Sequence, residues 1–221
     1  MTLNNPEIAL PSDSYNHKLT ICNFDKLDNN LQEEWLQLRR KYMDSNMDWH
    51  VENDYDEYDA DPSTIQLIMQ NEQGEITAGM RLTPRASIKE TLSWTMLPDI
   101  PDSVVDDFDG PVWDITRLVP GNINGFKKKL AAFAELFGAG LAVTLPLDEN
   151  PHWFFATSQA FIKIFKNYGI EFTPIPGTER GSSQLSHAYP VERTTFLVNN
   201  NDQFLDAGLS VQRGIARGSQ E

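Results

Sequence analysis

Hydrophobic residues recur along this chain with two different periods, one typical of helices and one typical of strands. In segments 31–44 and 126–143 the apolar residues return every three or four positions, which predicts two amphipathic helices. A further helix is expected at 159–168, ended by Gly169. Shorter segments rich in β-branched and aromatic residues predict strands at 18–23, 65–70, 75–83, 112–119, 153–157, 171–176 and 194–198.

The segment 71–74, Asn-Glu-Gln-Gly, lies between two of these strands and predicts a hairpin. Alternation along the second strand of the hairpin predicts one apolar face, made of Ile76, Ala78, Met80 and Leu82. Arg81 then lies on the opposite face beside Thr83, and Pro84 is expected to end the strand.

The chain shows no internal repeat, no linker between two cores and no low-complexity tract. Strands before, between and after the helices predict a single α/β or α+β domain over residues 1–221. Within it, residues 1–18 are rich in Asn, Pro and Ser and are expected to form a loose arm. The tail over 200–221 is expected to be weakly helical.

The charge balance changes which partners are reasonable. Eighteen basic and 32 acidic residues give a net charge of −14, which opposes nonspecific nucleic-acid binding and adsorption to anionic membranes. The single cysteine, Cys22, rules out an intramolecular disulfide and suits a reducing compartment. No apolar run is long enough for membrane insertion. A cytoplasmic protein is therefore expected.

A run of carboxylates with interleaved tyrosines, residues 52–59, closely follows Trp49. Aromatic faces beside carboxylates suit a small organic cation, through cation–π attraction and ion pairing. The spacing of Asp54, Asp56 and Asp59 resembles the start of an EF-hand, but the required glycine and final glutamate are missing, so no metal site is expected.

Three charged residues stand in otherwise apolar surroundings. Arg39 lies on the apolar side of the first helix and needs a carboxylate partner, for which the 52–59 acids are the nearest candidates. Asp114 and Arg117 interrupt an apolar strand, either as a structural ion pair or as a carboxylate near a reacting amine with an arginine that anchors an anionic group. Strict alternation puts them on opposite faces, so a shared site requires a β-bulge between them.

Four motifs in order resemble those of the acyl-homoserine lactone synthases, which make bacterial quorum-sensing signals. They are Leu38-Arg39 with Trp49, then 56–59 (Asp-Glu-Tyr-Asp), 80–84 (Met-Arg-Leu-Thr-Pro) and 112–117 (Val-Trp-Asp-Ile-Thr-Arg). The resemblance covers about residues 30–175. It implies an α/β fold, a GNAT-like α/β/α sandwich with a central mixed, mostly antiparallel sheet.

The resemblance also implies a reaction. The amine of S-adenosylmethionine attacks the thioester of an acyl-carrier protein, and the methionyl carboxylate then displaces methylthioadenosine and closes a lactone. No cofactor is implied, because S-adenosylmethionine is a substrate. Asp56 and Asp59 would offset its cationic groups, Trp49 would supply a π-face, and Arg39 or Arg117 would bind its carboxylate. Asp114, where the family has glutamate, would be the base.

The same resemblance assigns the remaining site residues. The catalytic set is Asp114, Arg117 and Arg39, and the substrate-binding set is Arg39, Met43 (phenylalanine in the family), Trp49, Asp56, Asp59, Arg81 and Thr116. Met96, Thr157 and Phe161 are assigned to the acyl chain, with the Thr157 hydroxyl suited to a 3-oxo group. Lys127, Lys128, Lys129, Lys163 and Lys166 are assigned to carrier-protein docking.

Two other functions stay open on the sequence. One is a different GNAT-type N-acyltransferase that uses acyl-CoA and another amine. The other is a non-catalytic relative that only binds a ligand, which the aspartate at position 114 keeps under consideration. Release of methylthioadenosine separates the synthase from both.

Overall fold

The computed structural model describes residues 7–9, 18–47, 54–95, 102–106, 110–144, 147, 152–158, 172–174 and 193–198. Eight strands form one sheet in the order β1-β2-β3-β4-β5-β6-β8-β7. Their bounds are β1 Glu7–Ala9, β2 Lys18–Cys22, β3 Ile65–Gln70, β4 Ile76–Arg85, β5 Val112–Pro120, β6 Trp153–Ser158, β7 Phe172–Pro174 and β8 Arg193–Val198. All neighbouring strands are antiparallel except β5 and β6, which are parallel.

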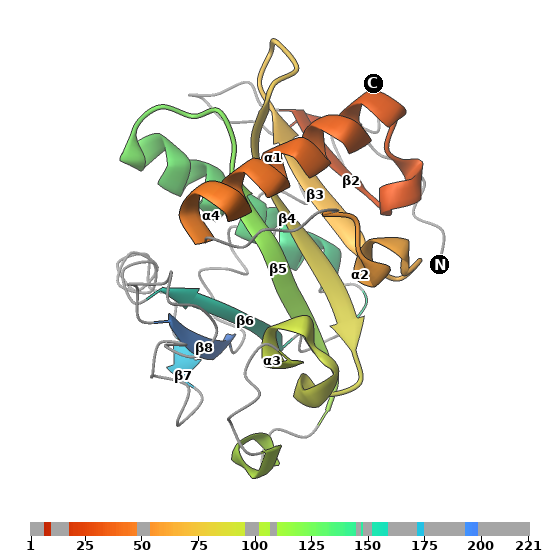
Figure 1. Ribbon diagram of the computed structural model, residues 1–221, viewed down its shortest axis with the longest axis vertical. Helices are drawn as coiled ribbons and strands as arrows, with labels where there is room; N and C mark the ends of the chain where they lie inside the picture. Colours follow the sequence, from red (N-terminus) through yellow and green to blue (C-terminus); the bar gives the residue numbers. More distant parts are fainter. Residues whose placement is uncertain are drawn as a thin grey trace.

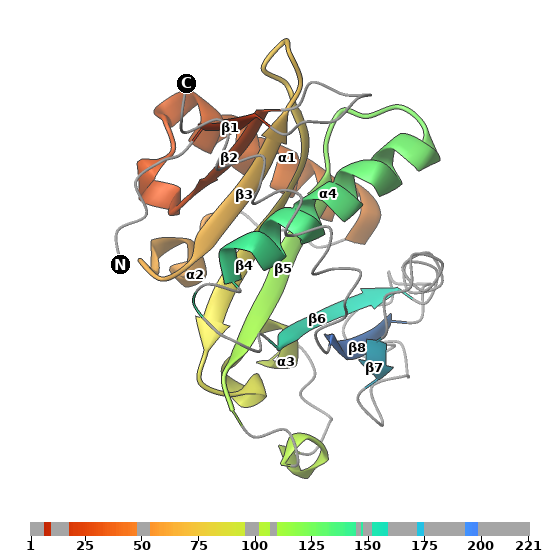
Figure 2. The same cartoon turned by 180° about the vertical axis from the view of Figure 1, so that it is seen from behind.

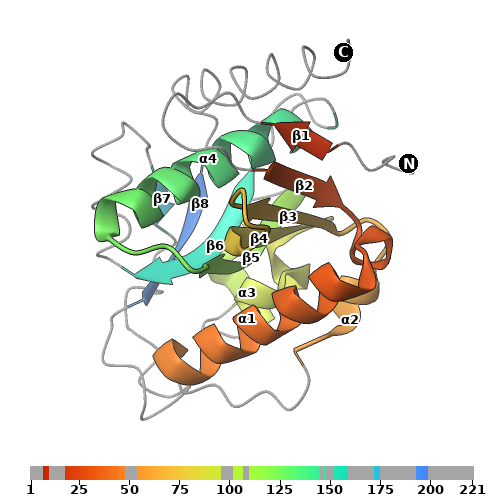
Figure 3. The same cartoon turned by 90° about the horizontal axis from the view of Figure 1, so that it is seen from above.

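Two long helices cover opposite faces of this sheet. Helix α1 (Asn29–Met47) lies on the face seen in Figure 1 and helix α4 (Phe126–Thr144) on the face seen in Figure 2, and the view along the layers separates them clearly (Figure 3). The short helices are η1 Phe24–Lys26, α2 Glu57–Ala60, η2 Ile88–Glu90, α3 Leu92–Thr95 and η3 Asp102–Val105. The predicted α/β/α sandwich with a mixed, mostly antiparallel sheet is confirmed.

Most of the predicted elements are observed, with two corrections. Part of the arm that was expected to be loose, Glu7–Ala9, forms a strand paired with β2. Strand β4 continues past Pro84 to Arg85. Because β3 begins opposite Leu82, Pro84 has β5 as its only neighbouring strand, and a proline is tolerated where one side of the strand needs no hydrogen bond. The helix expected at 159–168 and the 200–221 tail lie outside the described residues.

Apolar side chains fill both faces of the sheet. The cluster beneath α4 contains Leu67, Met80 and Phe137, and the cluster beneath α1 contains Trp35 and Ile68. The predicted apolar face of β4 needs a correction, since Ala78, Met80 and Leu82 face α4 but Ile76 packs on the α1 side. The register between β3 and β4 shifts at this point: Met69 pairs with Ala78 and Gln70 with Ile76, so the extra residue reverses the facing of Ile76.

A second bulge, in β5, decides where the polar residues of that strand lie. Thr116 pairs with Arg81 and Val119 with Gly79, so Arg117 and Leu118 both lie opposite Met80. Arg117 adopts the left-handed backbone conformation, with a φ of 54°. Ile115 and Leu118 pack toward α4, and the inserted residue keeps Arg117 on the α1 face, where it joins Asp114. The β-bulge that allows Asp114 and Arg117 to lie on the same face of the sheet is therefore present.

Strands β5 and β6 pair at only two positions and then diverge, as both ribbon views show (Figures 1 and 2). The paired positions are Trp113 with Trp153 and Asp114 with Phe154. The divergence therefore starts at Asp114. Within the part of the chain that the structure describes, no helix has the length and apolar character needed to cross a membrane.

Candidate functional site

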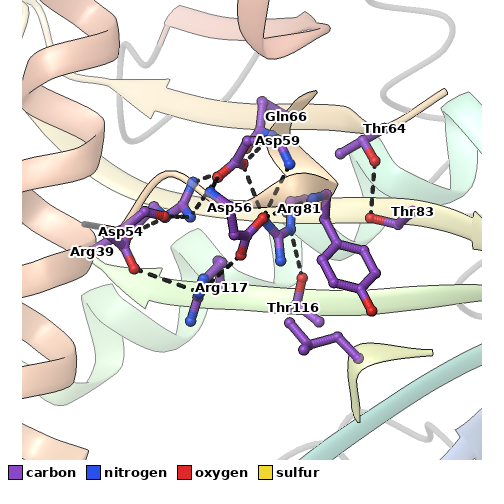
Figure 4. Close-up of polar contacts among 12 residues, drawn as sticks. Arg39, Asp54, Asp56, Asp59, Thr64, Gln66, Arg81, Thr83, Thr116 and Arg117 are labelled. Atoms are coloured by element: carbon purple, nitrogen blue, oxygen red, sulfur yellow. Dashed lines mark hydrogen bonds and ion pairs between the residues drawn. The ribbon is translucent and has the colours of Figure 1, made fainter. Parts of the chain in front are cut away.

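Two rows of polar side chains cross the sheet on the face that α1 covers. Gln66, Arg81 and Thr116 are in register on β3, β4 and β5. Two residues further along β4, Thr83 is in register with Asp114. Side chains in register on neighbouring antiparallel strands lie about 5 Å apart. Strand pairing by itself therefore gathers these polar groups (Figure 4).

Arg39 projects from α1 onto this face and is completely buried. Its Nη1 and Nη2 donate to the two carboxylate oxygens of Asp59 at 3.0 and 2.9 Å. Nη2 also donates to the backbone carbonyl of Asp54 at 2.5 Å, and Nε lies 2.5 Å from the Asp54 carboxylate. All three nitrogens thus face these two acids. Arg39 therefore holds the acidic segment against α1.

Arg81 and Arg117 meet at the carboxylate of Asp56. Nη1 of Arg81 donates to Oδ1 at 2.6 Å, and Nη2 of Arg117 donates to Oδ2 at 3.0 Å. Arg81 also donates from Nε to the Thr116 hydroxyl at 2.9 Å, and its Nη1 lies 3.1 Å from Asp59. Its Nη2 is buried and has no hydrogen-bond partner among the described residues.

The first turn of α2 orients the two aspartates that the arginines use. Asp56 is the N-cap: its Oδ1 accepts hydrogen bonds from the amides of Tyr58 and Asp59 at 3.0 and 3.1 Å. In return, Oδ2 of Asp59 accepts from the Asp56 amide at 3.2 Å. This reciprocal arrangement is a capping box, which needs polar side chains three positions apart. The Asp56–Asp59 spacing therefore turns both carboxylates toward the sheet.

Burial and the neighbouring arginines shift the pKa values of the aspartates in the cluster in opposite directions. Burial by itself would raise the pKa of the Asp56 carboxyl, but the charge and hydrogen bond of Arg81, aided by Arg117, outweigh it and the pKa is lowered. Asp54 is completely buried, and its contacts with Arg39 and Arg117 offset only part of the effect of burial. Burial therefore dominates there and raises the pKa of Asp54.

Asp114 lies beside the charged cluster and is completely buried. Its Oδ2 accepts from the amides of Leu92 and Ser93 at 2.7 and 3.4 Å, and its Oδ1 accepts from the Ser93 hydroxyl at 2.7 Å. Burial raises the pKa of this carboxyl, and the three hydrogen bonds offset only part of that rise. A carboxylate with a raised pKa binds a proton more readily, which suits a general base.

Aromatic rings border the site on two sides. The ring of Tyr58 lies 5.3 Å from the guanidinium of Arg81 and 4.8 Å from that of Arg85, both within cation–π range. Next to Asp114, the rings of Trp94 and Phe154 pack with their centroids 6.4 Å apart. Asp114 thus stands between a polar cluster suited to a charged group and an aromatic pair suited to an apolar one.

Among the residues that the sequence singled out, the structure brings together Arg39, Asp56, Asp59, Arg81, Thr116 and Arg117 (Figure 4). Asp114 lies beside them, in register with Thr83. Met43 instead packs in the apolar cluster beneath α1. Lys127, Lys128 and Lys129 lie in the first turn of α4, and Thr157 pairs with Thr194 between β6 and β8. Trp49, Met96, Phe161, Lys163 and Lys166 lie outside the described residues.

Sequence reasoning missed several polar residues of the site. Gln66 donates to Asp59 at 3.1 Å and accepts from the Trp35 indole at 3.1 Å, and the Thr64 hydroxyl donates to that of Thr83 at 3.1 Å. A glutamine inside the apolar strand 65–70 is a signal that could have revealed Gln66. No feature of the sequence distinguishes Ser93 from an ordinary loop serine.

No protein-family model matches the chain, and no curated protein matches it in sequence. Solved structures do match. The acyl-homoserine lactone synthase LasI superposes with a TM-score of 0.61 at 15% identity, over 88% of this chain and 95% of LasI. BjaI, a CoA-dependent acyl-homoserine lactone synthase solved with SAM and isopentyl-CoA, gives 0.60 at 15% identity, over 91% of this chain and 98% of BjaI.

An acyl-CoA N-acyltransferase from Pseudomonas aeruginosa also matches, with a TM-score of 0.55 at 14% identity, over 82% of this chain and 99% of that protein. Identities this low establish the fold. The chain therefore has the GNAT-like fold that acyl-homoserine lactone synthases share with N-acyltransferases.

Proposed function

We propose that this chain is an acyl-homoserine lactone synthase, which acylates S-adenosylmethionine with the acyl group of a carrier-protein thioester and releases methylthioadenosine and the lactone. The observation that carries the proposal is the buried cluster of Arg39, Arg81 and Arg117 with Asp54, Asp56 and Asp59, next to the isolated carboxylate of Asp114.

The cluster offers a complement to each charged group of S-adenosylmethionine. Arg81 Nη2, which is buried and has no hydrogen-bond partner in the described part of the chain, would donate to the substrate carboxylate. The Asp56 side chain is 24% exposed, whereas Asp54 and Asp59 are completely buried, so Asp56 is the acid that a cationic group can approach. Tyr58 would add a π-face. The contribution expected from Trp49 remains part of this proposal.

Asp114 would take the proton that the substrate ammonium must lose before it attacks the thioester. Asp56 is less suited to this role, because its lowered pKa makes it the weaker base. The acyl chain would lie toward Trp94 and Phe154, on the apolar side of Asp114, and the roles of Met96, Thr157 and Phe161 remain proposals. After amide formation, the methionyl carboxylate displaces methylthioadenosine: a carbon–oxygen bond forms and the carbon–sulfur bond breaks.

The runner-up is an acyl-CoA-dependent N-acyltransferase, favoured by the likeness in fold to the Pseudomonas enzyme. It would acylate a different amine and release free CoA. The donor of the synthase reaction is likewise a choice between acyl-carrier protein and acyl-CoA. Lys127, Lys128 and Lys129, in the first turn of α4, would supply a local basic patch for an acidic carrier protein on a chain with a net charge of −14.

The test is to incubate the purified protein with S-adenosylmethionine and an acyl-carrier-protein or acyl-CoA donor, and to detect methylthioadenosine and the lactone by mass spectrometry. Both products are expected. Acylation of an amine with release of CoA and no methylthioadenosine would transfer the assignment to the runner-up.

The variant Asp114→Asn tests whether Asp114 is the general base of the proposed reaction. The Asn amide oxygen can accept from the Leu92 and Ser93 amides, and its NH2 can donate to a turned Ser93 hydroxyl, so the fold is expected to be kept. Turnover should fall about 100-fold or more, as expected for loss of a general base. Asp114→Glu should retain activity. The exposed Asp106, paired with Lys89 at 2.6 Å, supplies the control Asp106→Asn; equal activity of the two Asn variants would show that Asp114 is not the base.

A further inference from the structure

The hydrogen bonds of Asp114 restrict how a proton can reach it. Among the described residues, its Oδ2 accepts from the backbone amides of Leu92 and Ser93 alone, and a backbone amide donates a hydrogen bond without passing its proton on. Its Oδ1 accepts from the Ser93 hydroxyl at 2.7 Å. Among the described residues, this hydroxyl is the only hydrogen-bond partner of Asp114 that can both give and receive a proton.

Asp114 is completely buried, and Ser93, at 5% exposed, is buried beside it. Thr83 and Phe154 flank Asp114 on the neighbouring strands, and α3 lies over it. Along the hydrogen bonds of the described residues, a proton can therefore reach the Asp114 carboxylate only through the Ser93 hydroxyl.

We propose that Ser93 is a catalytic residue of the proposed reaction, which relays the proton of the substrate ammonium to Asp114. The nitrogen gives its proton to Ser93 Oγ while the Oγ proton passes to Asp114 Oδ1. The products are a neutral amine with a free electron pair, an unchanged serine and a neutral Asp114. No additional reactant is needed. This inference rests on the proposed function, of which it specifies the proton path.

The relay accounts for an aspartate at a position where the resemblance predicts glutamate. The arm of aspartate is shorter by one carbon–carbon bond, about 1.5 Å. The Ser93 oxygen lies 2.7 Å from Oδ1, so a relay through it would extend the reach of the aspartate by more than this difference. The raised pKa of Asp114 adds support, because it favours the proton at the end of the relay.

A purely structural role for the hydroxyl is the competing explanation. Helix α3 does not need it, because each amide of its first turn already has an acceptor. Leu92 and Ser93 donate to Asp114 Oδ2, Trp94 donates to the Thr91 hydroxyl at 3.0 Å, and Thr95 donates to the Thr91 carbonyl at 3.1 Å. The Ser93 hydroxyl satisfies only Oδ1.

The test compares Ser93→Ala with the wild type at saturating S-adenosylmethionine. We expect kcat to fall at least about tenfold, within the range for proton-transfer groups, with the KM for S-adenosylmethionine changed less than twofold. Removal of a hydrogen bond to the Asp114 carboxylate should also move the acidic limb of the kcat/KM profile to higher pH. Ser93→Thr, which keeps a hydroxyl, should recover most of the rate.

Two further variants separate the relay from damage to α3. Thr91→Val removes the other hydroxyl at the start of α3 but leaves the Ser93–Asp114 bond intact, and its kcat should stay within about threefold of the wild type. In the Asp114→Glu background the longer carboxylate reaches toward the serine position, so Ser93→Ala should then cost less than about threefold. A loss that equals that of Thr91→Val, or that is as large in the Asp114→Glu background, would overturn the relay.

Failure of the relay and failure of the proposed function are distinguishable. If the wild type releases methylthioadenosine and Ser93→Ala does so at an equal rate, the relay is refuted and the function stands. If the wild type acylates an amine without releasing methylthioadenosine, the proposed function is refuted, and the same variants then decide the relay on the acylation rate. A wild type inactive with every donor refutes both.

Discussion

The buried charge cluster makes a strong prediction about the single substitution Asp59→Asn. Asp59 is 4% exposed and accepts both hydrogen bonds of the bidentate pair with Arg39, and it lies 3.1 Å from Nη1 of Arg81. Three arginines and three aspartates balance each other in this cluster. Removal of one carboxylate leaves a positive charge buried without compensation, and we expect the protein to fold but to lose stability.

The amount of stability that Asp59→Asn loses can be estimated from the burial of the Arg39–Asp59 ion pair. Removal of one partner from a buried ion pair typically costs about 3–5 kcal/mol. For a chain of this length, 1 kcal/mol corresponds to a shift in Tm of about 2–4 °C, so Asp59→Asn should lower Tm by about 6–20 °C. Calorimetry and urea unfolding of the two proteins would measure the difference.

The chain supplies a matched control two residues away. Asp61 also pairs with an arginine, Arg85 at 2.9 Å, but the two side chains are 26% and 17% exposed. Ion pairs at this exposure contribute about 0–1 kcal/mol, so Asp61→Asn should shift Tm by only a few degrees. Equal effects of the two substitutions would refute the reasoning, because they would show that the burial of Asp59 confers no special dependence on its charge.

Two further predictions concern the same face of the sheet. Burial raises the pKa of the Cys22 thiol to about 11. At pH 8 the thiolate fraction of Cys22, and with it the rate of reaction with a disulfide reagent, should therefore be about 100-fold lower in the native protein than in urea. Equal rates in the two states would contradict the burial of Cys22. A Cβ at Gly79 would lie 2.6 Å from the Trp35 ring, so Gly79→Ala should lower the free energy of unfolding, measured in urea, by about 1–3 kcal/mol. Because phenylalanine has a smaller ring, Trp35→Phe in the same protein should restore much of that loss. Additive effects of the two changes would show that the ring is not the obstacle.

Local patterns allowed much of the fold to be predicted. Strand alternation in 75–83 placed Arg81 on the face opposite Met80 and beside Thr83, as observed. Asp56 and Asp59 are three residues apart, and their capping box needs nothing beyond that spacing. Apolar periodicity alone located the helices now seen as Asn29–Met47 and Phe126–Thr144.

Other features depended on contacts between distant segments. Ile76 faces α1 because the β3–β4 register shifts by one residue, which no local pattern of β4 reveals. Arg39 pairs with Asp59 and Asp54 out of a run of acids because α2 places Asp59, and the segment just before α2 places Asp54, against α1. Ser93 became a candidate only when α3 was seen to lie over Asp114.

The sequence by itself indicated that Arg39, Asp114 and Arg117 would be buried charges, since an arginine or aspartate in an apolar strand or helix face must find a partner. It also determined that Asp114 and Arg117 could share a site only across a bulge. The tertiary structure decided that the bulge lies at Arg117 and Leu118 opposite Met80, and that Asp114 pairs with Ser93 rather than with Arg117. The physical reason is the two-residue period of a strand: one inserted residue reverses the facing of everything beyond it, and only the pairing with neighbouring strands fixes where the insertion falls.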